Sequence, residues 1–280
     1  MVGRAIAAAV TPLRDDGAAL DESAFDPLTR FLAAAGLDGM LALGTTGEGV
    51  LLSPTERERA ASLFVSARQP GFKVLVHCGA QSTRDTVRLA AHAAEIEADG
   101  IAVIAPPYFP LDQDSMLAHF IAAANACRPL PFYVYEFAAR SGYAVPPAMI
   151  ERLRDSVSNL RGLKVSDAPF EAVRPYLLDG LEVLVGFEPL TLEAMAHGAA
   201  GTVSGLATAF PELIVALVRE RTPARQEEVV RLRADLQSVP FHATMKAVLR
   251  ARGIPVNEDV RSPLRGLSAE ERQRVLRLLP

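Results

Sequence analysis

The feature that most constrains the fold is a regular alternation of short apolar runs with helix-like segments. The runs are apolar throughout instead of alternating with polar residues, a pattern typical of strands buried on both faces of a parallel sheet. There are eight of them, at Gly3–Val10, Gly39–Leu43, Lys73–Cys78, Ile101–Ala105, Phe132–Tyr135, Leu163–Val165, Leu181–Val185 and Gly201–Ser204. Eight strand–helix steps of similar length favour a (β/α)8 TIM barrel over an open doubly wound sheet. No Gly-x-Gly-x-x-Gly fingerprint follows the first run, which argues further against the open sheet.

Helix-like segments separate these runs. The best-marked start has Ser53 as N-cap, Pro54 at the first helical position and Glu56 two residues later, which predicts a capping box. Others are predicted at Ser23–Ala35, Thr83–Ala98, Ser115–Cys127, Pro147–Asp155, Pro169–Leu178 and Leu190–His197. After Ser204 only helices are predicted, at Phe210–Arg219, Ala224–Leu236, Phe241–Arg252 and Ser268–Leu279. We therefore expect an α/β chain with a barrel over residues 1–208 and a C-terminal helical extension of the same domain over residues 209–280.

Composition excludes several classes of function. The chain has 29 Lys and Arg residues against 33 Asp and Glu, with a net charge of −4 and no basic cluster, so a nucleic-acid partner is not expected. It has no apolar run long enough for a membrane span. The first apolar run lacks a convincing cleavage site, so we interpret it as a strand and not as a signal peptide. The two cysteines, Cys78 and Cys127, lie far apart, which suits reduced thiols in the cytoplasm.

Lys164 is the most informative single residue. It is one of three lysines in the chain and lies in the apolar run Leu160–Val165. In a barrel the chemistry lies at the carboxyl ends of the strands. Burial there would disfavour an ammonium and favour the free amine, which is a Schiff-base nucleophile. A lysine that reaches solvent from the strand end, or pairs with Asp167, explains the residue equally well when it is taken alone.

The other residues that follow the apolar runs supply hydroxyl groups. They are Thr45 and Thr46 in the turn after the second run, Tyr108 after the fourth and Tyr135 at the end of the fifth. Phenols and hydroxyls around an amine suit imine chemistry on a 2-oxo acid, because they can shuttle the protons. A glycine-flanked turn can hold the carboxylate with its N–H groups. Each residue alone also fits a structural role, as a tight turn, a core aromatic or a loop aromatic. No His or carboxylate cluster has metal-ligand spacing, so no metal is predicted.

Taken together, these motifs carry a family resemblance. Gly44-Thr-Thr-Gly-Glu48, Pro106-Pro-Tyr108, Tyr135 with Arg140-Ser-Gly142, Gly162-Leu-Lys164 and Gly201-Thr-Val-Ser-Gly205 occur in order along the chain. The sequence resembles the dihydrodipicolinate synthase / N-acetylneuraminate lyase family of class I, Schiff-base-forming, pyruvate-dependent aldolases. The resemblance extends over essentially the whole chain, including the segment around Met245 and Lys246.

The resemblance implies a role for several positions. It implies that Lys164 forms the imine, that Tyr135 and Thr45 relay protons, and that Tyr108 relays protons alongside the site of a neighbouring subunit. It also implies four substrate contacts: Thr46 and Gly47 at the pyruvate carboxylate, Arg140 at a carboxylate of the second substrate, and Val203 lining the pocket under the imine. It further implies a homo-oligomer built as a dimer of dimers, and no metal or organic cofactor.

Departures from the pattern concern the second substrate. Tyr135 is followed by Glu136-Phe-Ala138 where the synthase branch has Asn-Val-Pro, and Pro107 replaces one of two tyrosines. Val165-Ser166 after the lysine is closer to the sugar-acid aldolases. Glu136, Ser166 and Glu188 are candidates for binding the hydroxyls of a polyol chain, or are solvated residues at strand ends.

Several functions are therefore open at this point. We expect a cytoplasmic lyase that joins pyruvate to an aldehyde, or splits the product, with a 2-keto-3-deoxy sugar acid as the favoured substrate. The alternative is 4-hydroxy-tetrahydrodipicolinate (dihydrodipicolinate) synthase, which condenses pyruvate with aspartate semialdehyde. A non-catalytic barrel that binds an oxo acid is a more remote alternative. A phosphate-handling barrel isomerase, suggested by Gly198, Gly201 and Gly205, lacks an evident Glu base and His electrophile.

Overall fold

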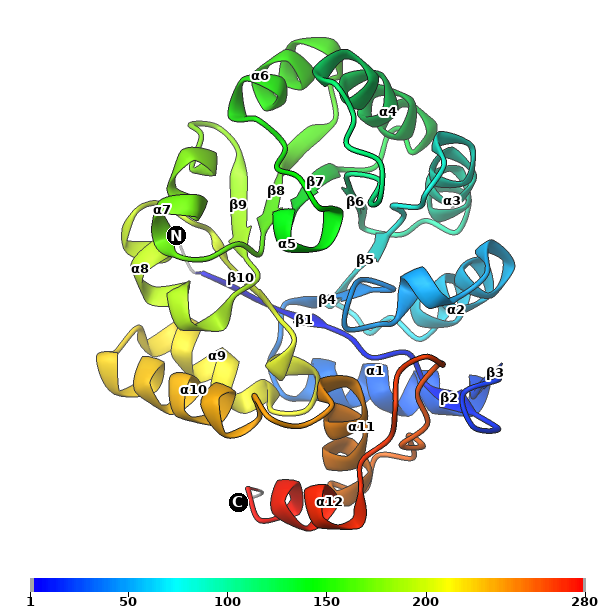
Figure 1. Ribbon diagram of the computed structural model, residues 1–280, viewed down its shortest axis with the longest axis vertical. Helices are drawn as coiled ribbons and strands as arrows, with labels where there is room; N and C mark the ends of the chain where they lie inside the picture. Colours follow the sequence, from blue (N-terminus) through cyan, green and yellow to red (C-terminus); the bar gives the residue numbers. More distant parts are fainter. Residues whose placement is uncertain (1–2, 279–280) are drawn as a thin grey trace.

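Eight parallel strands form a closed barrel, as the sequence predicts. The structure is a computed structural model that describes residues 3–278. The ends of the predicted domain and of the last predicted helix therefore lie outside the described residues, namely Met1, Val2, Leu279 and Pro280. The strands are β1 (Arg4–Ala8), β4 (Gly39–Ala42), β5 (Lys73–His77), β6 (Gly100–Ile104), β7 (Phe132–Glu136), β8 (Leu160–Val165), β9 (Glu182–Val185) and β10 (Gly201–Ser204). Each strand pairs with its neighbours in the chain, and β1 closes the ring by pairing with β10 (Figure 1).

The strands present alternate side chains to the two sides of the ring. Inside the barrel, nine buried side chains form one packed column, namely Ile6, Ala8, Leu41, Leu75, Ala102, Tyr133, Tyr135, Leu184 and Val203. The intervening residues, such as Leu163 and Val165, belong to the larger core between the strands and the surrounding helices. This two-sided burial explains why the strands are apolar at every position.

The surrounding helices follow the predicted order. They are α1 (Phe25–Ala34), α2 (Pro54–Ser66), α3 (Thr83–Glu95), α4 (Gln113–Ala126), α6 (Pro147–Ser156), α7 (Phe170–Val173) and α8 (Thr191–Ala196). The capping box at Ser53 and Glu56 is present, with Pro54 at the start of α2. The predicted helix Pro169–Leu178 is instead α7 followed by a 3-10 turn at Arg174–Tyr176. Pro175 lies in this turn, and a proline cannot supply the N–H that would continue an α-helix.

Two short elements were not predicted. The polar turn Arg14–Gly17 belongs to a small antiparallel hairpin of β2 (Leu13–Arg14) and β3 (Ala19–Leu20). The helix α5 (Ala138–Ser141) lies in the connection after β7, near the middle of the ring in Figure 1. It carries Arg140.

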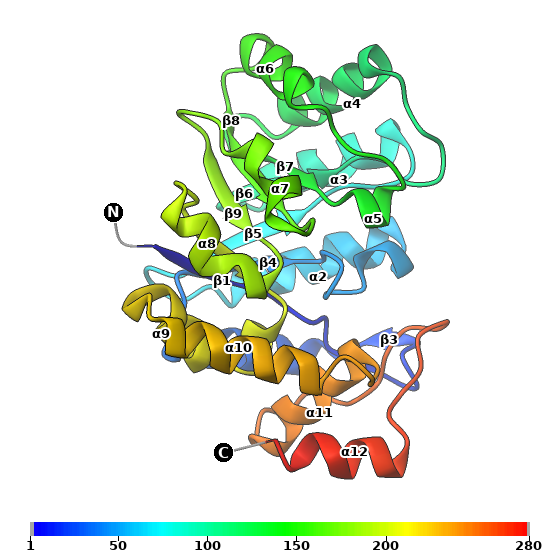
Figure 2. The same ribbon diagram turned by 60° about the vertical axis from the view of Figure 1, so that its left-hand side comes forward.

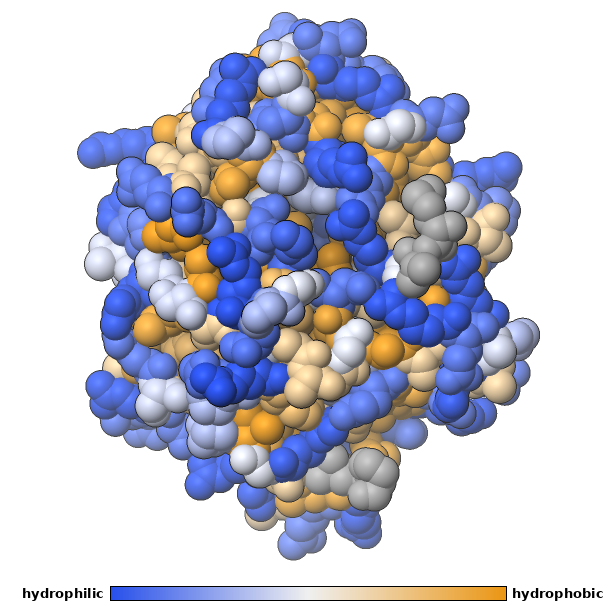
Figure 3. Space-filling view, turned by 180° about the vertical axis from the view of Figure 1, so that it is seen from behind, coloured by the Kyte–Doolittle hydropathy of each residue, from blue (hydrophilic) through white to orange (hydrophobic). Residues whose placement is uncertain are grey.

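The C-terminal segment is helical, as expected. It consists of α9 (Pro211–Glu220), α10 (Pro223–Asp235), α11 (Phe241–Ala251) and α12 (Ala269–Leu276). α9 packs against β1 and β10, so it takes the place of the eighth helix of the ring, and α10 packs on α9. α11 and α12 pack on each other below the ring (Figure 2). The face turned away from the viewer in Figure 1 is mostly hydrophilic, with smaller hydrophobic areas between charged side chains (Figure 3).

Candidate active site

Lys164 lies at the carboxyl end of β8 with its amine inside the barrel. Its side chain is buried, and Nζ lies 3.9 Å from the centroid of the Tyr135 ring. Tyr135 is its register partner on β7. The neighbouring strand leaves room for the lysine because residue 186 is a glycine. A Cβ atom on Gly186 would lie 3.2 Å from Lys164 Cε and 1.9 Å from Ser166 Oγ.

Tyr135 and Thr45 are joined by their hydroxyl groups. Tyr135 OH lies 3.1 Å from Thr45 Oγ1, and either oxygen can be the donor. The backbone carbonyl of Thr45 in turn accepts a hydrogen bond of 3.0 Å from Nε2 of His242, a residue of α11. The amine, the phenol and the threonine hydroxyl that the sequence predicted to act together are therefore neighbours at one end of the barrel.

The turn that carries Thr45 and Thr46 is held in a tight conformation. A Cβ atom on Gly49 would lie 1.9 Å from the carbonyl oxygen of Leu43, so the backbone is packed against itself at this point. Gly47 is buried, and its carbonyl accepts a hydrogen bond of 2.6 Å from Thr11. Thr46 is buried next to Gly205, toward which its hydroxyl points.

A fully buried ion pair supports this turn from the C-terminal segment. Lys246 Nζ donates to Glu48 Oε1 at 2.6 Å and to the carbonyl of Asp259 at 2.6 Å. The backbone N–H of Arg261 donates to the other oxygen of Glu48 at 2.7 Å. Burial lowers the pKa of Lys246, and the Glu48 carboxylate opposes that shift. Glu48 has φ = 56°, so this pair also holds a backbone conformation that is unfavourable for a non-glycine residue.

Glu136 points away from the barrel interior, where the Lys164 amine lies. It is buried, and its Oε2 accepts a hydrogen bond of 2.9 Å from the backbone N–H of Val145. Asp167 accepts a hydrogen bond of 3.0 Å from the N–H of Ala138. These two carboxylates thus fix both ends of the segment that contains α5. Burial, and the Asp167 carboxylate after it, raise the pKa of Glu136 to about 8.

Arg140 and Val203, two further residues expected to contact the substrate, have different surroundings. Val203 is a buried member of the interior column. Arg140 is exposed on α5, with its guanidinium carbon 5.6 Å from the ring centroid of Phe137. Phe137 itself stacks on Tyr135 with the centroids 6.2 Å apart. Arg140 therefore lies at the edge of the mouth, one aromatic ring away from the proposed relay tyrosine.

Two predicted site residues do not join this group. Tyr108 is 80% exposed and contacts Phe109 edge to face, so within one chain it lies outside the site. Glu188 is buried, and its Oε1 accepts hydrogen bonds from Ser204 Oγ at 2.9 Å and from the N–H of Leu206 at 3.1 Å. Because Glu188 is used by the fold, its expected role as a hydroxyl ligand is not supported. The strand-end position that suggested this role gave no information on the direction of the side chain.

Sequence reasoning missed two histidines next to the site. His77 is buried on β5, 5.7 Å from the Tyr135 ring between centroids. Burial, followed by the charges of Arg57 and Lys164, holds the pKa of His77 well below its usual value, so the ring is neutral. His242, which orients Thr45, is the second. Neither residue belongs to a recognisable motif, and no local signal places them at the mouth.

Residues 3–278 contain neither a metal-binding cluster nor a membrane-spanning helix. No group of three or more His, Cys, Asp or Glu side chains is arranged to hold a metal ion. None of the helices in this range is both long enough and apolar enough to cross a membrane.

Comparison with known proteins identifies relatives along the full length. The family described as the dihydrodipicolinate synthetase family matches residues 1–280. An uncharacterized DapA-like lyase of Halobacterium salinarum is 36% identical over 92% of this chain and 87% of its own length. A 4-hydroxy-tetrahydrodipicolinate synthase of Syntrophus aciditrophicus is 30% identical over 98% of this chain and 96% of its own length.

Solved structures give the same result. YagE, a prophage protein of the dihydrodipicolinic acid synthase family from E. coli K12 determined in complex with pyruvate, has a TM-score of 0.92 and 26% identity, covering 100% of this chain and 98% of that one. The N-acetylneuraminate lyase of Proteus mirabilis has a TM-score of 0.90 and 27% identity, covering 98% of this chain and 96% of that one. The resemblance seen in the sequence is thereby confirmed.

Proposed function

Because the chain belongs to the dihydrodipicolinate synthetase family, and is therefore a lyase of a Schiff-base-forming family, we propose that it makes or breaks a carbon–carbon bond between pyruvate and an aldehyde through an imine on Lys164. The observation that carries this proposal is the arrangement of Lys164, Tyr135 and Thr45, with the amine 3.9 Å from the phenol ring and the two hydroxyls 3.1 Å apart. An amine flanked by a proton relay is what imine formation requires.

In the proposed reaction, the Lys164 amine adds to the keto carbon of pyruvate and forms a C–N bond. Tyr135, linked to Thr45, passes a proton to the oxygen of this adduct, and water leaves to give the imine. Loss of a proton from the methyl carbon yields an enamine, whose carbon attacks the aldehyde carbonyl. The C–C bond forms as the C=O π bond breaks, and the aldehyde oxygen takes up a proton to become the 4-hydroxyl. Addition of one water to the new imine releases the 4-hydroxy-2-oxo acid and returns the free amine. Cleavage is the same sequence in reverse.

We place the aldehyde next to Ser166 and Arg140, and propose a 2-keto-3-deoxy sugar acid as the product or substrate. The Ser166 hydroxyl lies beside Lys164 across Gly186 and makes no hydrogen bond to any residue of 3–278. A hydroxyl at this place suits a hydroxylated chain, and the Arg140 guanidinium suits an anionic end. Condensation of pyruvate with aspartate semialdehyde remains the second candidate. Arg140 also favours that anionic aldehyde, and the Syntrophus relative carries the name of that synthase.

The experiment that tests the imine is borohydride reduction in the presence of pyruvate. We expect one pyruvate-derived mass on the peptide that contains Lys164, and no adduct in Lys164→Met. Lys73→Met is the matched control, because Lys73 is exposed at the other end of the barrel. An adduct on another peptide, or none in the unaltered protein, would remove the mechanism. Cleavage of 2-keto-3-deoxygluconate assayed beside condensation with aspartate semialdehyde then separates the two substrates.

We also propose that the protein is a homo-oligomer, a dimer of dimers, in the cytoplasm. Support for assembly comes from Val50, Tyr108 and Phe109, which are 74%, 80% and 72% exposed although they are large and apolar. A partner subunit that covered them would bring Tyr108 toward a site. Both cysteines are free and buried, which suits a reducing compartment. Light scattering of the purified protein measures the assembly, and a monomer would contradict it.

A further inference from the structure

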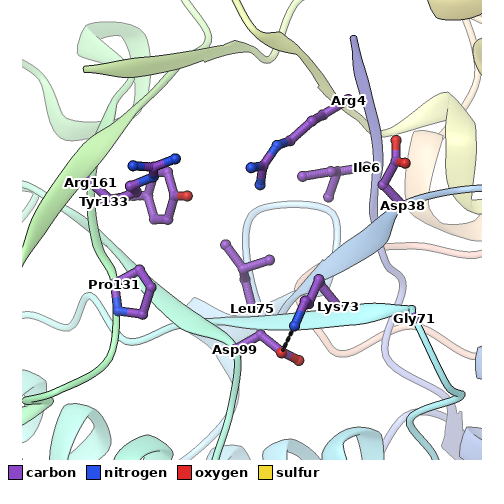
Figure 4. A pocket seen from close by; sticks show the side chains of 10 residues that line it. All are labelled: Arg4, Ile6, Asp38, Gly71, Lys73, Leu75, Asp99, Pro131, Tyr133 and Arg161. Atoms are coloured by element: carbon purple, nitrogen blue, oxygen red, sulfur yellow. Dashed lines mark hydrogen bonds and ion pairs between the residues drawn. The ribbon is translucent and has the colours of Figure 1, made fainter. Parts of the chain in front are cut away.

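A cavity of about 400 Å³ lies at the amino-terminal ends of the strands, at the other end of the barrel from Lys164 (Figure 4). We call it the basal cavity. Its apolar lining includes Ile6, Leu75 and Tyr133, which belong to the interior column. Its rim carries charged side chains from the first residues of several strands. The volume falls within the range of sites that hold small molecules.

Two carboxylates at the rim already have partners. Asp99 accepts hydrogen bonds of 2.8 Å from Lys73 and 2.9 Å from Arg68. Asp38 accepts one of 2.7 Å from Arg219. Arg68 and Arg219 also donate to backbone carbonyls, so these cations serve the fold. Lys73, which is 60% exposed, keeps donors beyond its bond to Asp99 and can take part in binding an anion.

Arg4 and Arg161 differ from Arg68 and Arg219, because they line the cavity itself. Figure 4 shows them reaching toward the opening from opposite sides. Within residues 3–278 their acidic partner is Glu182, which lies 2.6 Å from Arg4 Nε and 3.6 Å from Arg161 Nε. The same carboxylate also accepts a hydrogen bond of 2.7 Å from the Tyr133 hydroxyl. One carboxylate shared by two guanidinium groups and a phenol leaves most of the guanidinium N–H donors without an acceptor among the described residues.

Charge around the cavity is also unbalanced. Among the described residues, the charged side chains that line the cavity are three cations, Arg4, Lys73 and Arg161, and two carboxylates, Asp38 and Asp99. A concave surface with an excess of one sign of charge concentrates the electric field and attracts ligands of the opposite charge. The lining therefore favours an anionic ligand over a neutral or cationic one.

We propose that the basal cavity binds a small organic dianion. Its two anionic groups pair with Arg4 and Arg161, whose planar guanidinium groups match carboxylate and phosphate oxygens. Its carbon skeleton lies on Ile6, Leu75 and the ring of Tyr133. The site is separate from the mouth at Lys164 and does not depend on the proposed reaction.

Isothermal titration calorimetry at constant ionic strength tests this site. The probes are succinate, glycerol 3-phosphate and the uncharged succinamide, each titrated into the full-length protein. We expect at least one of the two dianions to bind, and succinamide not to bind. The double variant Arg4→Gln/Arg161→Gln should bind about tenfold more weakly or worse, a loss of about 1.4 kcal/mol. Whichever dianion binds more tightly identifies the carboxylate or phosphate source.

Matched variants distinguish binding in the basal cavity from binding at the mouth or elsewhere on the surface. Arg30→Gln removes an exposed arginine on α1 and should leave binding unchanged. Arg140→Gln should also leave it unchanged, because only a dianion held at the mouth would lose affinity there. Loss of both cations next to Glu182 could unfold the double variant, so a second double variant, Arg4→Lys/Arg161→Lys, keeps the positive charges. It should still bind the dianion more weakly, because lysine lacks the planar guanidinium group. The proposal is overturned if neither dianion binds, if succinamide binds as well, if the arginine variants bind normally, or if Arg140→Gln abolishes binding.

Discussion

At the level of single residues, the hydroxyl of Thr45 makes a contact that a side chain of the same size without an oxygen could not make. It contacts Tyr135 OH, while the Thr45 backbone is held by His242, so both the side chain and the peptide are positioned. A valine would fill the same space without the oxygen. The contact between the two hydroxyls can therefore be tested separately from packing.

We predict that Thr45→Val slows the trapping of pyruvate by borohydride about 10²-fold, the usual contribution of a positioned proton-transfer group. Thr45→Ser, which keeps the oxygen, should stay close to the unaltered protein. The trapped fraction is measured over time by mass spectrometry, with circular dichroism as the folding control. Equal rates for the valine and serine variants would show that the hydroxyl takes no part in the relay.

Glu136 gives a prediction on pH. Burial and Asp167 raise the pKa of this carboxyl from 4.5 to about 8, so between these values the folded protein holds a proton that the unfolded chain releases. The unfolding free energy therefore falls as the pH rises through that window. Glu136→Gln resembles the protonated acid and should therefore remove part of this pH-dependent decrease in the unfolding free energy. The melting temperature of Glu136→Gln should exceed that of the unaltered protein at about pH 9 but not at about pH 5.

The control for this pH effect is Glu151→Gln, which changes an exposed glutamate on α6. It should follow the unaltered protein at both pH values. If Glu136→Gln also followed the unaltered protein, the pH dependence would arise elsewhere.

At the level of elements, the buried pair of Lys246 and Glu48 joins α11 to the turn that carries Thr45 and Thr46. Both side chains are fully buried. Removing one partner of such a pair leaves an uncompensated charge and costs about 3–5 kcal/mol. We therefore expect Lys246→Met to lower the unfolding free energy by about this amount, measured by urea denaturation.

Two comparisons make this prediction specific. Arg30→Met breaks an exposed pair on α1 and should cost about 0.5 kcal/mol or less. Adding Glu48→Gln to Lys246→Met removes the buried charge and should restore part of the loss. A double variant less stable than Lys246→Met would mean that Glu48 acts through its hydrogen bond to Arg261 and not through the ion pair.

The strands and most helices could be predicted because their signals are local. A run that is apolar at every position, or a Ser-Pro-x-Glu start such as that of α2, lies within one short segment. Elements of a few residues, such as α5 and the hairpin of β2 and β3, are too short for periodicity to reveal. The apolar pattern alone predicted one helix over Pro169–Leu178, whereas the structure has a 3-10 turn around Pro175.

The site could be predicted only in part, for a related reason. Lys164 and Tyr135 end apolar runs, and the barrel topology brings all strand ends to one mouth. His242 contacts Thr45 across 197 positions and Lys246 contacts Glu48 across 198, so no local pattern indicates either contact. The direction of a side chain at a strand end is equally hidden, which is why Glu188 was assigned to the pocket.

At the level of the complete chain, we infer from the packing that the C-terminal helices form one folding unit with the barrel. α9 packs on β1 and β10, and α11 supplies His242 and Lys246 to the turn that carries Thr45 and Thr46. α12 contributes one buried residue, Val275. The two parts of the extension should therefore differ in how much the barrel needs them.

We predict that a chain ending at residue 208 does not fold cooperatively and does not trap pyruvate. A chain ending at residue 267, which lacks only α12 and the residues after it, should still do both with reduced stability. Thermal melting by circular dichroism and borohydride trapping measure these outcomes. A cooperative transition in the chain of residues 1–208 would show that the barrel is an independent domain.

The pairing of β1 with β10 has a consequence for synthesis of the chain. Arg4 is the register partner of Gly201, so the first strand to leave the ribosome has to wait for the last before the ring can close. At roughly 5–20 residues per second this wait is on the order of ten to forty seconds. Throughout it, one edge of β1 offers unpaired N–H and C=O groups to any other nascent chain. The demand of this protein for chaperones should therefore follow the speed of translation and the crowding of polysomes more closely than the stability of the finished enzyme.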